Sequence, residues 1–567
     1  MLHRAARSAI EFAGGPNFVA GHEPPLARPT LGVDGVRHQL SEVPIAWERA
    51  LGWIPTFTCT IGDLLVRGTI FAPYGRDADV SGAVYALSIE NRGSAARTVD
   101  VALDGTAGHR QLRVQTPRPF EDAARVGRGE SGAVLLEGAS LPGLATLAIL
   151  ADGDSQVDIT GVSYAIRRTI TVAAGAREQV AFFIAVGPER DGAESTAIVL
   201  RRRGWRELLA ATRDALQSLE QASGHEAIDR LINRNLLFAY FYAVGRALDD
   251  AQYYLVRSRV PWNGHGVTVR DWDALTWTIP AVQLADAPLA RELLLRMCEL
   301  HGYAPGRGVH YLDGTLFEPG FALEGVAGYP IATDRYIRDT GDDRVVDEPV
   351  LADTLYLVAD DLDARRDKRI PLYTTEVSPS GVPAPHPFTL HANAAAAHAL
   401  DVLRRTLDEE TAKELQDPDA VRAAIHRHFV VEQPAKASAT SAPAGGRSVF
   451  ASSIDLAGAT SEADDPSASA FWLPIYEAVP RHDSTYRRTV KAIDVTPQSL
   501  TQQCARLIGP DAANVLQWLR RAPLDGGRAA EVIDADGKAV ANGGDASLSG
   551  LLAWTAWYAV NALGERP

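Results

Sequence analysis

The sequence contains few cysteines and no long apolar run. Its three cysteines, Cys59, Cys298 and Cys504, stand far apart, with no Cys-x-x-Cys pair and no histidine at ligand spacing. This distribution argues against a disulfide framework and a structural zinc site, and it predicts buried thiols. No window approaches the length of a membrane span, and the N-terminal stretch lacks the apolar core of a signal peptide. We therefore expect a cytoplasmic protein with no membrane partner.

Clustered basic charge is scarce as well. The net charge is −15, and the only short basic run is "LRRRGW" at 200–205. A nucleic-acid partner is therefore not expected. The common phosphate and hydrolase motifs (GxGxxG after a strand, Walker A, GxSxG and HExxH) are missing. His386 and His391 flank a proline-rich turn without a third ligand, so the sequence predicts no metal site and no cofactor.

The N-terminal third of the 567-residue chain has the pattern of antiparallel strands. Hydrophobic residues alternate with polar ones over 84–91, 97–105 and 178–189, and Gly, Asn, Asp and Ser separate such runs. Period-two alternation broken by turn residues is typical of a β-sandwich with one buried face per sheet. We predict an antiparallel β-sandwich domain over residues 1–200.

Helical periodicity dominates the rest of the chain. The pattern predicts a linker helix over 201–225 and an all-α domain over 226–567, with amphipathic helices at 226–248, 289–300, 390–407 and 550–564. Long loops rich in Gly, Pro and aromatic residues separate these helices, and such loops commonly carry binding and catalysis. Paired helices with loops at alternate ends fit a toroid of helical hairpins. Because no sequence repeat is visible, periodicity alone does not distinguish a toroid from a solenoid.

Acidic and aromatic residues gather in four loop windows, at 261–277, 317–342, 453–477 and 529–557. Any single member has an ordinary structural explanation: tryptophan fills gaps between helices, and an acid at a helix N-terminus, such as Glu324, stabilises that end. Indole rings also stack on the C–H faces of sugars, and paired carboxylates bind hydroxyl groups. Four windows of the same composition therefore favour a carbohydrate site alongside the structural explanation.

Together these windows resemble the inverting glycosidases of the six-hairpin (α/α)6 class. The closest similarity is to glycogen-debranching-type amylo-glucosidases and exo-α-1,6-mannosidases. It is carried, in order, by "VRDWDALTWTIPAV", "LEGVAGYPIATDRYIRDTGD", "DDPSASAFWLPIYEA" and "EVIDADGKAVANGGDASLSGLLAWTAW". The resemblance covers about residue 226 to the C-terminus. It implies a multidomain protein in which an antiparallel β-sandwich precedes an all-α (α/α)6 toroid.

The resemblance also implies roles for individual residues. Glu324 falls where the family has its general acid, and Glu531 falls where it has its general base. A Glu at position 324 departs from this branch, which more often has Asp there. Arg270 and Asp271 would hold hydroxyl groups of the sugar at the cleavage site. The further implied substrate-binding residues are Trp262, Trp272, Asp273, Tyr329, Asp465 and Trp472.

The chemistry of inversion can be compared with these two windows. One carboxyl group must protonate the leaving oxygen while an ionised one, about 6.5–9.5 Å away, activates water. The apolar stretch "ALEGVAGY" around Glu324 is expected to raise the pKa of an acid, and the polar stretch "EVIDADGK" is expected to keep Glu531 ionised. The two environments differ in the direction that inversion requires.

The leading hypothesis is therefore an exo-acting inverting glycoside hydrolase that takes a small, α-linked carbohydrate. An inverting glycoside phosphorylase of the same architecture is the nearest alternative. A non-catalytic carbohydrate-binding protein would retain the tryptophans without needing two acids in contrasting loops. A polysaccharide lyase usually has its toroid before its sandwich, opposite to this chain. The sugar, the linkage and the oligomeric state stay open at this point.

Overall fold

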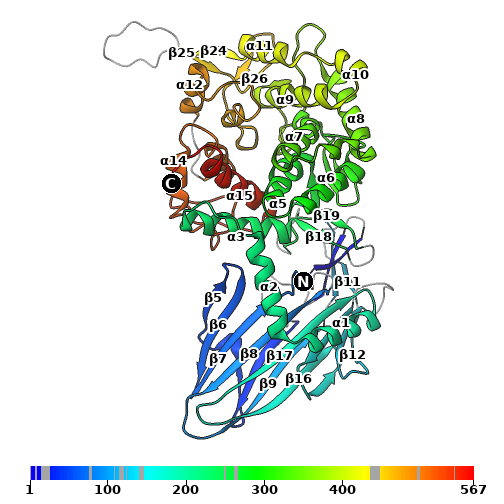
Figure 1. The fold of residues 1–567 in the computed structure, drawn as a ribbon, viewed down its shortest axis with the longest axis vertical. Helices are drawn as coiled ribbons and strands as arrows, with labels where there is room; N and C mark the ends of the chain where they lie inside the picture. Colours follow the sequence, from blue (N-terminus) through cyan, green and yellow to red (C-terminus); the bar gives the residue numbers. More distant parts are fainter. Residues whose placement is uncertain are drawn as a thin grey trace, which may run out of the picture. The chain divides into compact units, whose positions relative to one another are not determined.

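The computed structural model (Figure 1) describes most of the chain and divides it into two compact units. The described residues are 2–6, 9–13, 26–75, 80–107, 109–113, 120–122, 124–138, 146–247, 251–260, 263, 266–433, 447–493, 498–541 and 543–566. The first unit consists of Met1–Glu220 and Arg246–Gln252, and the second of Gln221–Gly245 and Tyr253–Pro567.

Two antiparallel sheets form the centre of the first unit. The larger sheet has the order β12-β13-β14-β17-β8-β7-β6-β5, with β5 (Ala46–Ala50), β6 (Ile54–Ile61), β7 (Leu64–Phe71), β8 (Gly82–Asn91), β12 (Ala124–Arg128), β13 (Val134–Gly138), β14 (Thr146–Ala151) and β17 (Arg177–Gly187). The smaller has the order β15-β16-β9-β3-β4, with β3 (Arg28–Val33), β4 (Val36–Gln39), β9 (Arg97–Thr106), β15 (Gln156–Thr160) and β16 (Ser163–Val172). A further sheet, in the order β1-β2-β10-β11, consists of β1 (Leu2–Ala6), β2 (Ala9–Ala13), β10 (His109–Arg113) and β11 (Phe120–Asp122).

The alternating residues of the predicted strands form one core between these sheets. Leu87 and Ile89 of β8 meet Val101 of β9 and Phe182 of β17 there, which confirms the predicted antiparallel sheet region. The opposite face of β17, including Phe183, is buried too, because α1 (Arg190–Arg203) packs on β14 and β17. Helix α1 ends at Gly204, where φ is 79°, and α2 (Trp205–Leu219) begins directly afterwards.

The second unit is mainly helical, as predicted. Its helices are α3 (Glu226–Tyr242), α4 (Asp271–Asp273), the π-helix η2 (Ala274–Thr278), α5 (Ile279–Ala285), α6 (Ala287–His301), α7 (Leu323–Thr340), α8 (Pro349–Arg365), α9 (Leu390–Thr406), α10 (Glu409–Glu414), α11 (Pro418–His428), α12 (Ser484–Ala492), α13 (Leu500–Arg506), α14 (Ala512–Leu519) and α15 (Ala546–Asn561). Short 3-10 turns are η1 (Leu40–Glu42) in the first unit and η3 (Asp343–Asp347), η4 (Pro466–Ala468) and η5 (Ala470–Trp472) in the second.

Short strands lie between these helices. They are β18 (Val244–Arg246), β19 (Tyr253–Leu255), β20 (Thr268–Arg270), β21 (Val309–Tyr311), β22 (Leu316–Glu318), β23 (Phe388–Thr389), β24 (Val430–Gln433), β25 (Arg447–Phe450), β26 (Ser453–Ile454) and β27 (Thr460–Ser461). The helix predicted over 226–248 is shorter in the structure, because α3 ends at Tyr242 and the chain continues as β18.

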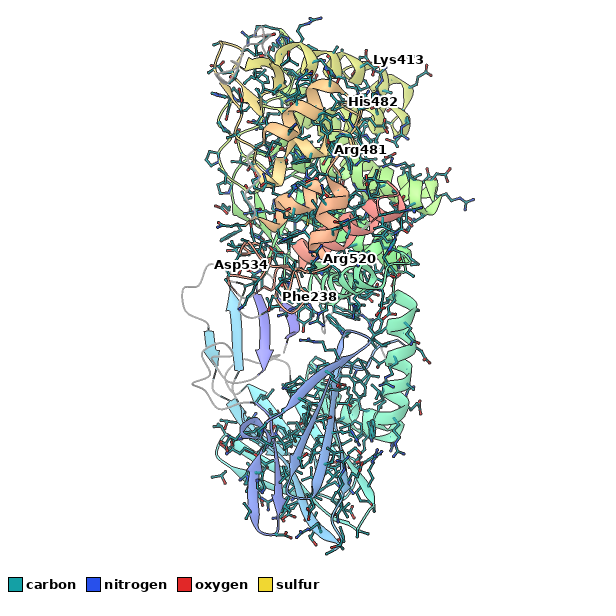
Figure 2. All side chains as sticks on the ribbon, turned by 90° about the vertical axis from the view of Figure 1, so that its left-hand side faces the viewer. Phe238, Lys413, Arg481, His482, Arg520 and Asp534 are labelled. Atoms are coloured by element: carbon teal, nitrogen blue, oxygen red, sulfur yellow. The ribbon has the colours of Figure 1, made fainter. Side chains whose placement is uncertain are left out.

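Helix pairs build the interior of the second unit. Helix α3 packs on α15, α7 on α9, and α5 on α6, and Figure 1 shows α5, α7 and α15 side by side near the centre of this unit. Phe238 of α3 is buried among these helices, whereas Lys413 of α10 points into solvent (Figure 2). Within the described ranges, every helix is too short or too polar to cross a lipid bilayer.

Candidate active site

The first group of predicted site residues lies at the start of an irregular helix. Strand β20 ends at Arg270, and α4, η2 and α5 follow without interruption from Asp271 to Ala285. Strand β20 pairs with β21, with Arg270 opposite Val309. A π-helical turn inside an α-helix is uncommon and often marks a functional site. Asp271, Trp272 and Asp273 thus occupy the N-terminal end of a helix that is buried along its length.

Glu324 lies in the first turn of α7 and is almost completely buried, with 1% of its surface exposed. Its Oε1 atom is 3.1 Å from Nδ1 of His391, near the start of α9, and Nε2 of His391 is 3.4 Å from the Tyr476 hydroxyl. The Trp272 ring meets the His391 ring edge-on, with centroids 5.4 Å apart. The other oxygen, Oε2, is buried without a hydrogen-bond partner among the described residues.

Because Gly325 has no side chain, the start of α7 packs closely against the loop that contains Gly306. A Cβ atom on Gly325 would lie 2.7 Å from Cα of Gly306 and 3.6 Å from Cβ of Asp271. The Gly306 N–H donates a 2.9 Å hydrogen bond to Oδ2 of Asp271, and its carbonyl accepts one of the same length from Ala322 N–H. The small residues of "ALEGVAGY" therefore hold Asp271 beside the start of α7.

A second, charged cluster contains Glu531. The Arg257 guanidinium donates to Oδ2 of Asp545 at 2.6 Å and to Oε2 of Glu531 at 3.3 Å. Asp545 also caps α15, because its Oδ1 accepts from Leu548 N–H at 3.1 Å. The Glu531 side chain is 60% exposed. Glu531 therefore lies in a polar, solvated place, unlike Glu324.

The segment Asp271–Asp273 joins the two clusters. Trp272 contacts His391, the partner of Glu324, and the next residue, Asp273, lies in the electrostatic range of Arg257 and Glu531. Burial raises the pKa of Asp273 to about 6, although the nearby arginines oppose the shift. Burial also raises the pKa of Asp271 to about 7, against the hydrogen bond from Gly306. The segment that touches both clusters thus contains two buried carboxyl groups.

A pocket opens beside this segment. Its free space is about 470 Å³, and its walls are Arg270, Asp271 and Trp272 together with residues of the stretches 306–309, 318–325 and 377–381. Among the described residues, the Arg270 guanidinium has no recorded ion pair or hydrogen bond, and it lies near Gly381 on the opposite wall. The pocket is open to solvent and combines an indole, a carboxyl group and a guanidinium, which are groups that can contact a sugar ring and its hydroxyl groups.

The remaining predicted residues that the structure describes do not line this pocket. Tyr329 is fully buried next to Asp271, and its hydroxyl makes no hydrogen bond of normal geometry there. Asp465 caps η4 by accepting from Ser467 N–H at 2.9 Å. Trp472 is buried and stacks on Trp554 of α15 at a centroid distance of 6.4 Å. Trp262 lies outside the described residues.

Several residues of the two clusters carry no sequence motif. Arg257 stands in the unremarkable stretch "VRSRV", and Tyr476 is one aromatic among many in "FWLPIYEA". Asp545 lies five residues before the helix predicted at 550–564, and it caps α15 because this helix begins earlier, at Ala546. His391 was visible at the start of a predicted helix, but its partner, Glu324, is 67 positions away in the sequence. Such pairs depend on how helix ends meet, which the sequence pattern does not encode.

Comparisons with known proteins bear on the fold. No protein-family model and no curated protein sequence matches the chain. Among solved structures, a bacterial glucoamylase complexed with acarbose matches 100% of this chain and 95% of its own, with a TM-score of 0.61 and 12% identity. A putative kojibiose phosphorylase from the human microbiome matches 97% of this chain and 82% of its own, with a TM-score of 0.58 and 10% identity.

The chain shares the fold of these enzymes. The predicted resemblance to the six-hairpin glycosidases is thereby confirmed at the level of the fold, with a sheet-rich N-terminal region before a helical one. A metal-independent α-mannosidase of Streptococcus pneumoniae, solved in a non-productive complex with α-1,6-mannobiose, matches 62% of this chain and 98% of its own, with a TM-score of 0.49 and 14% identity. At 10–12% identity the first two likenesses concern architecture and leave the reaction to the residues of the site.

Proposed function

We propose that the chain is an inverting, exo-acting glycoside hydrolase for a small, α-linked carbohydrate, with Glu324 as general acid and Glu531 as general base. In this proposal the helical unit closes as an (α/α)6 toroid, and the site lies where the N-terminal ends of α4, α7, α9 and α15 come together. The fold shared with a glucoamylase and a kojibiose phosphorylase supports an enzyme of this class.

The contrast between the two glutamates carries the proposal. Glu324 is 1% exposed and contacts an imidazole, whereas the Glu531 side chain is 60% exposed and faces a guanidinium. A general acid must hold a proton, which low solvation favours, and a general base must be ionised, which water and a cation favour. Inversion needs one carboxyl group of each kind, separated by room for a water molecule.

The unpaired oxygen of Glu324 indicates which of its two oxygens would carry the proton. Oε1 is engaged by His391, so Oε2, which has no partner among the described residues, is the oxygen that would protonate the leaving group. Because Oε2 is out of contact with solvent, substrate binding must open the surrounding side chains. Arg270 and Asp271 would hold the hydroxyl groups of the terminal sugar in the pocket, next to Trp272.

A panel of aryl α-glycosides and α-linked disaccharides tests the proposal, with the anomer of the first product followed by NMR. We expect release of the inverted sugar, and a loss of kcat of about 10³-fold or more in both Glu324→Gln and Glu531→Gln. Azide should rescue the Glu531→Gln variant partially by replacing the activated water. Retained turnover in both variants would refute the assignment, and binding without turnover by the unmodified chain would indicate a carbohydrate-binding protein.

An inverting phosphorylase is the second candidate. The observation in its favour is the Arg270 guanidinium, which lines the pocket without an ion pair among the described residues and is suited to phosphate oxygens. In a phosphorylase, phosphate takes the place of the water, so Glu531 would not be needed as a base. Adding phosphate to the same panel separates the two: a sugar 1-phosphate product, with Glu531→Gln still active, would establish the phosphorylase.

A further inference from the structure

A buried group of one carboxylate and two imidazoles lies behind the pocket. Asp271 begins α4, His301 ends α6, and His310 is the central residue of β21. One potential ligand atom from each residue lies within 4.8 Å of the other two. The two imidazole rings have centroids 5.3 Å apart. Three elements that are distant in sequence therefore bring typical metal-binding side chains to one place.

The polar atoms of this group lack partners. Oδ1 of Asp271, Nδ1 of His301 and Nδ1 of His310 are all buried, and none makes a hydrogen bond of normal geometry among the described residues, although the Tyr329 hydroxyl lies close to the Asp271 carboxyl. The three residues are only 1–2% exposed. Buried polar atoms are normally satisfied by protein or by a bound species, because leaving one unpaired costs about 1–3 kcal/mol. A species bound among these three residues would supply the missing partners.

The charge of Asp271 points to the chemistry of the occupant. Oδ2 accepts a hydrogen bond from the neutral Gly306 N–H, and no ion pair of Asp271 is recorded within the described part of the chain. A buried carboxyl group is either protonated or compensated by a cation, because an unpaired buried charge is strongly unfavourable. The nearby Arg296 carries its own partner, because it is ion-paired with Glu299 at 2.5 Å. A cation bound between Asp271 and the two histidines would compensate the carboxylate directly.

We propose that Asp271, His301 and His310 bind a divalent transition-metal ion, with zinc as the best match. Two imidazoles and one carboxylate form an established ligand set for zinc, with bonds of about 2.0–2.2 Å. Tetrahedral ligand atoms around such an ion are about 3.4 Å apart, whereas the present atoms lie within 4.8 Å of one another, so the group must close by up to about 1.4 Å on binding.

The site has a consequence for the neighbouring pocket. Asp271 lines that pocket and also contributes to the metal group. With Oδ1 on the ion and Oδ2 on Gly306 N–H, the carboxylate of Asp271 would be fixed in direction, and Oδ2 would keep a lone pair for a hydroxyl group of the ligand. The ion would then hold in place the wall against which a ligand of the pocket rests. This structural role concerns metal binding and does not depend on the proposed hydrolase activity.

Metal analysis of the full chain tests the site. The protein is purified without a histidine tag, incubated with Zn²⁺, dialysed, and measured by inductively coupled plasma mass spectrometry. We expect about one zinc ion per chain, and a loss of at least tenfold in occupancy in His301→Gln and His310→Gln. The matched control is His398→Gln, which removes another buried histidine, one that pairs with Asp334, and this variant should retain its zinc.

A second measurement on the unmodified chain guards against misfolding of the variants. Cobalt in place of zinc should give visible absorption bands of a coordinated ion, and removing the metal with a chelator should lower the thermal unfolding midpoint reversibly. Less than a tenth of an equivalent of zinc, together with an unchanged midpoint, would overturn the site and leave an adventitious ion only or a buried water. Zinc that persists in both histidine variants would overturn it as well.

Discussion

Nδ1 of His391 lies 3.1 Å from Oε1 of Glu324, and each of the two residues is the second residue of its helix, α9 and α7 respectively. The other ring nitrogen is 3.4 Å from the Tyr476 hydroxyl. If that hydroxyl donates to Nε2, the neutral imidazole carries its proton on Nδ1 and donates to Glu324. The contact then fixes one carboxyl oxygen of Glu324 and leaves the other to react.

Replacing His391 tests whether this contact positions the acid. We expect His391→Ala to lower kcat about 10²-fold with a change in KM of less than about threefold, because Glu324 loses its orientation while the pocket walls stay in place. Steady-state kinetics on the cleaved glycoside measures both constants. Tyr476→Phe is the control, since it removes only the longer hydrogen bond and should cost less than tenfold. Equal losses in both variants, or a loss in KM alone, would contradict the positioning role.

Arg257 stabilises the second cluster, and its removal should be costly. Arg257→Met leaves the partly buried Asp545 without its 2.6 Å partner, so we expect a loss of about 2 kcal/mol in the free energy of unfolding. Urea denaturation measures this loss. Asn is also a good helix cap, so Asp545→Asn should cost less than Arg257→Met. In the double variant the loss should be smaller than the sum of the two single losses, because the unpaired carboxylate is gone. Additive losses would show that the pair is not coupled.

The lowered pKa of Asp334 predicts how the stability of the protein depends on pH. Burial opposes its charge, but hydrogen bonds from His398 and Arg405 and the nearby Arg338 outweigh burial and hold the pKa of Asp334 below its ordinary value of 3.8. A lowered pKa in the folded state stabilises the protein fully above the unfolded-state pKa, and this stabilisation is lost as pH falls below about 4.

The comparison with Asp334→Asn isolates this contribution. At pH 7 we expect the variant to be less stable by about 2 kcal/mol. Between about pH 4 and pH 2 the difference should shrink, because this carboxylate becomes protonated in the unfolded wild-type chain while it is still ionised in the folded one, and the asparagine of the variant does not titrate in either state. Urea denaturation at a series of pH values measures the two curves. A difference that stays constant down to pH 2 would show that the ion pairs of Asp334 do not lower its pKa.

Sequence periodicity predicted the layers of the fold well, for a physical reason. The strands with Leu87 and Phe182 alternate because one face of each enters the sandwich core, and a two-residue period is visible in any short window. The stretch Thr-Gly-Asp at 340–342 is a local helix-stop signal of the same kind, and Gly341 does end α7, with φ at 74°. Local signals of this kind depend on neighbouring residues alone.

The site was predictable only in part, because its contacts are not local. The predicted windows contain Glu324, Asp271 and Glu531, yet the partners that define their environments, such as Arg257, come from unmarked stretches. Trp472 has the composition of a sugar-stacking residue, but in the structure it packs on Trp554 inside the unit. A residue type in a loop indicates what it can bind, whereas the meeting of helix ends decides what it does bind.

Gly325 offers the sharpest test of the helix start that brings Asp271 and Glu324 together. A Cβ at this position would lie 2.7 Å from Cα of Gly306, a backbone atom that no side-chain rotation can move away. We expect Gly325→Ala to push the Gly306 loop away from α7 and weaken the hydrogen bond to Asp271. The expected cost is about 1–3 kcal/mol of stability and a drop in kcat/KM of about tenfold or more.

Gly341→Ala is the matched control for this prediction. Gly341 ends the same helix with φ at 74°, and a Cβ there would meet nothing within 4 Å. Alanine in this left-handed conformation costs about 1 kcal/mol without displacing a neighbour, so stability should fall while kcat/KM of the folded enzyme stays the same. Thermal unfolding and steady-state kinetics on both variants separate the two effects. If the two variants lose activity equally, the close approach of Gly325 to Gly306 does not shape the site, and the small residues at the start of α7 serve packing alone.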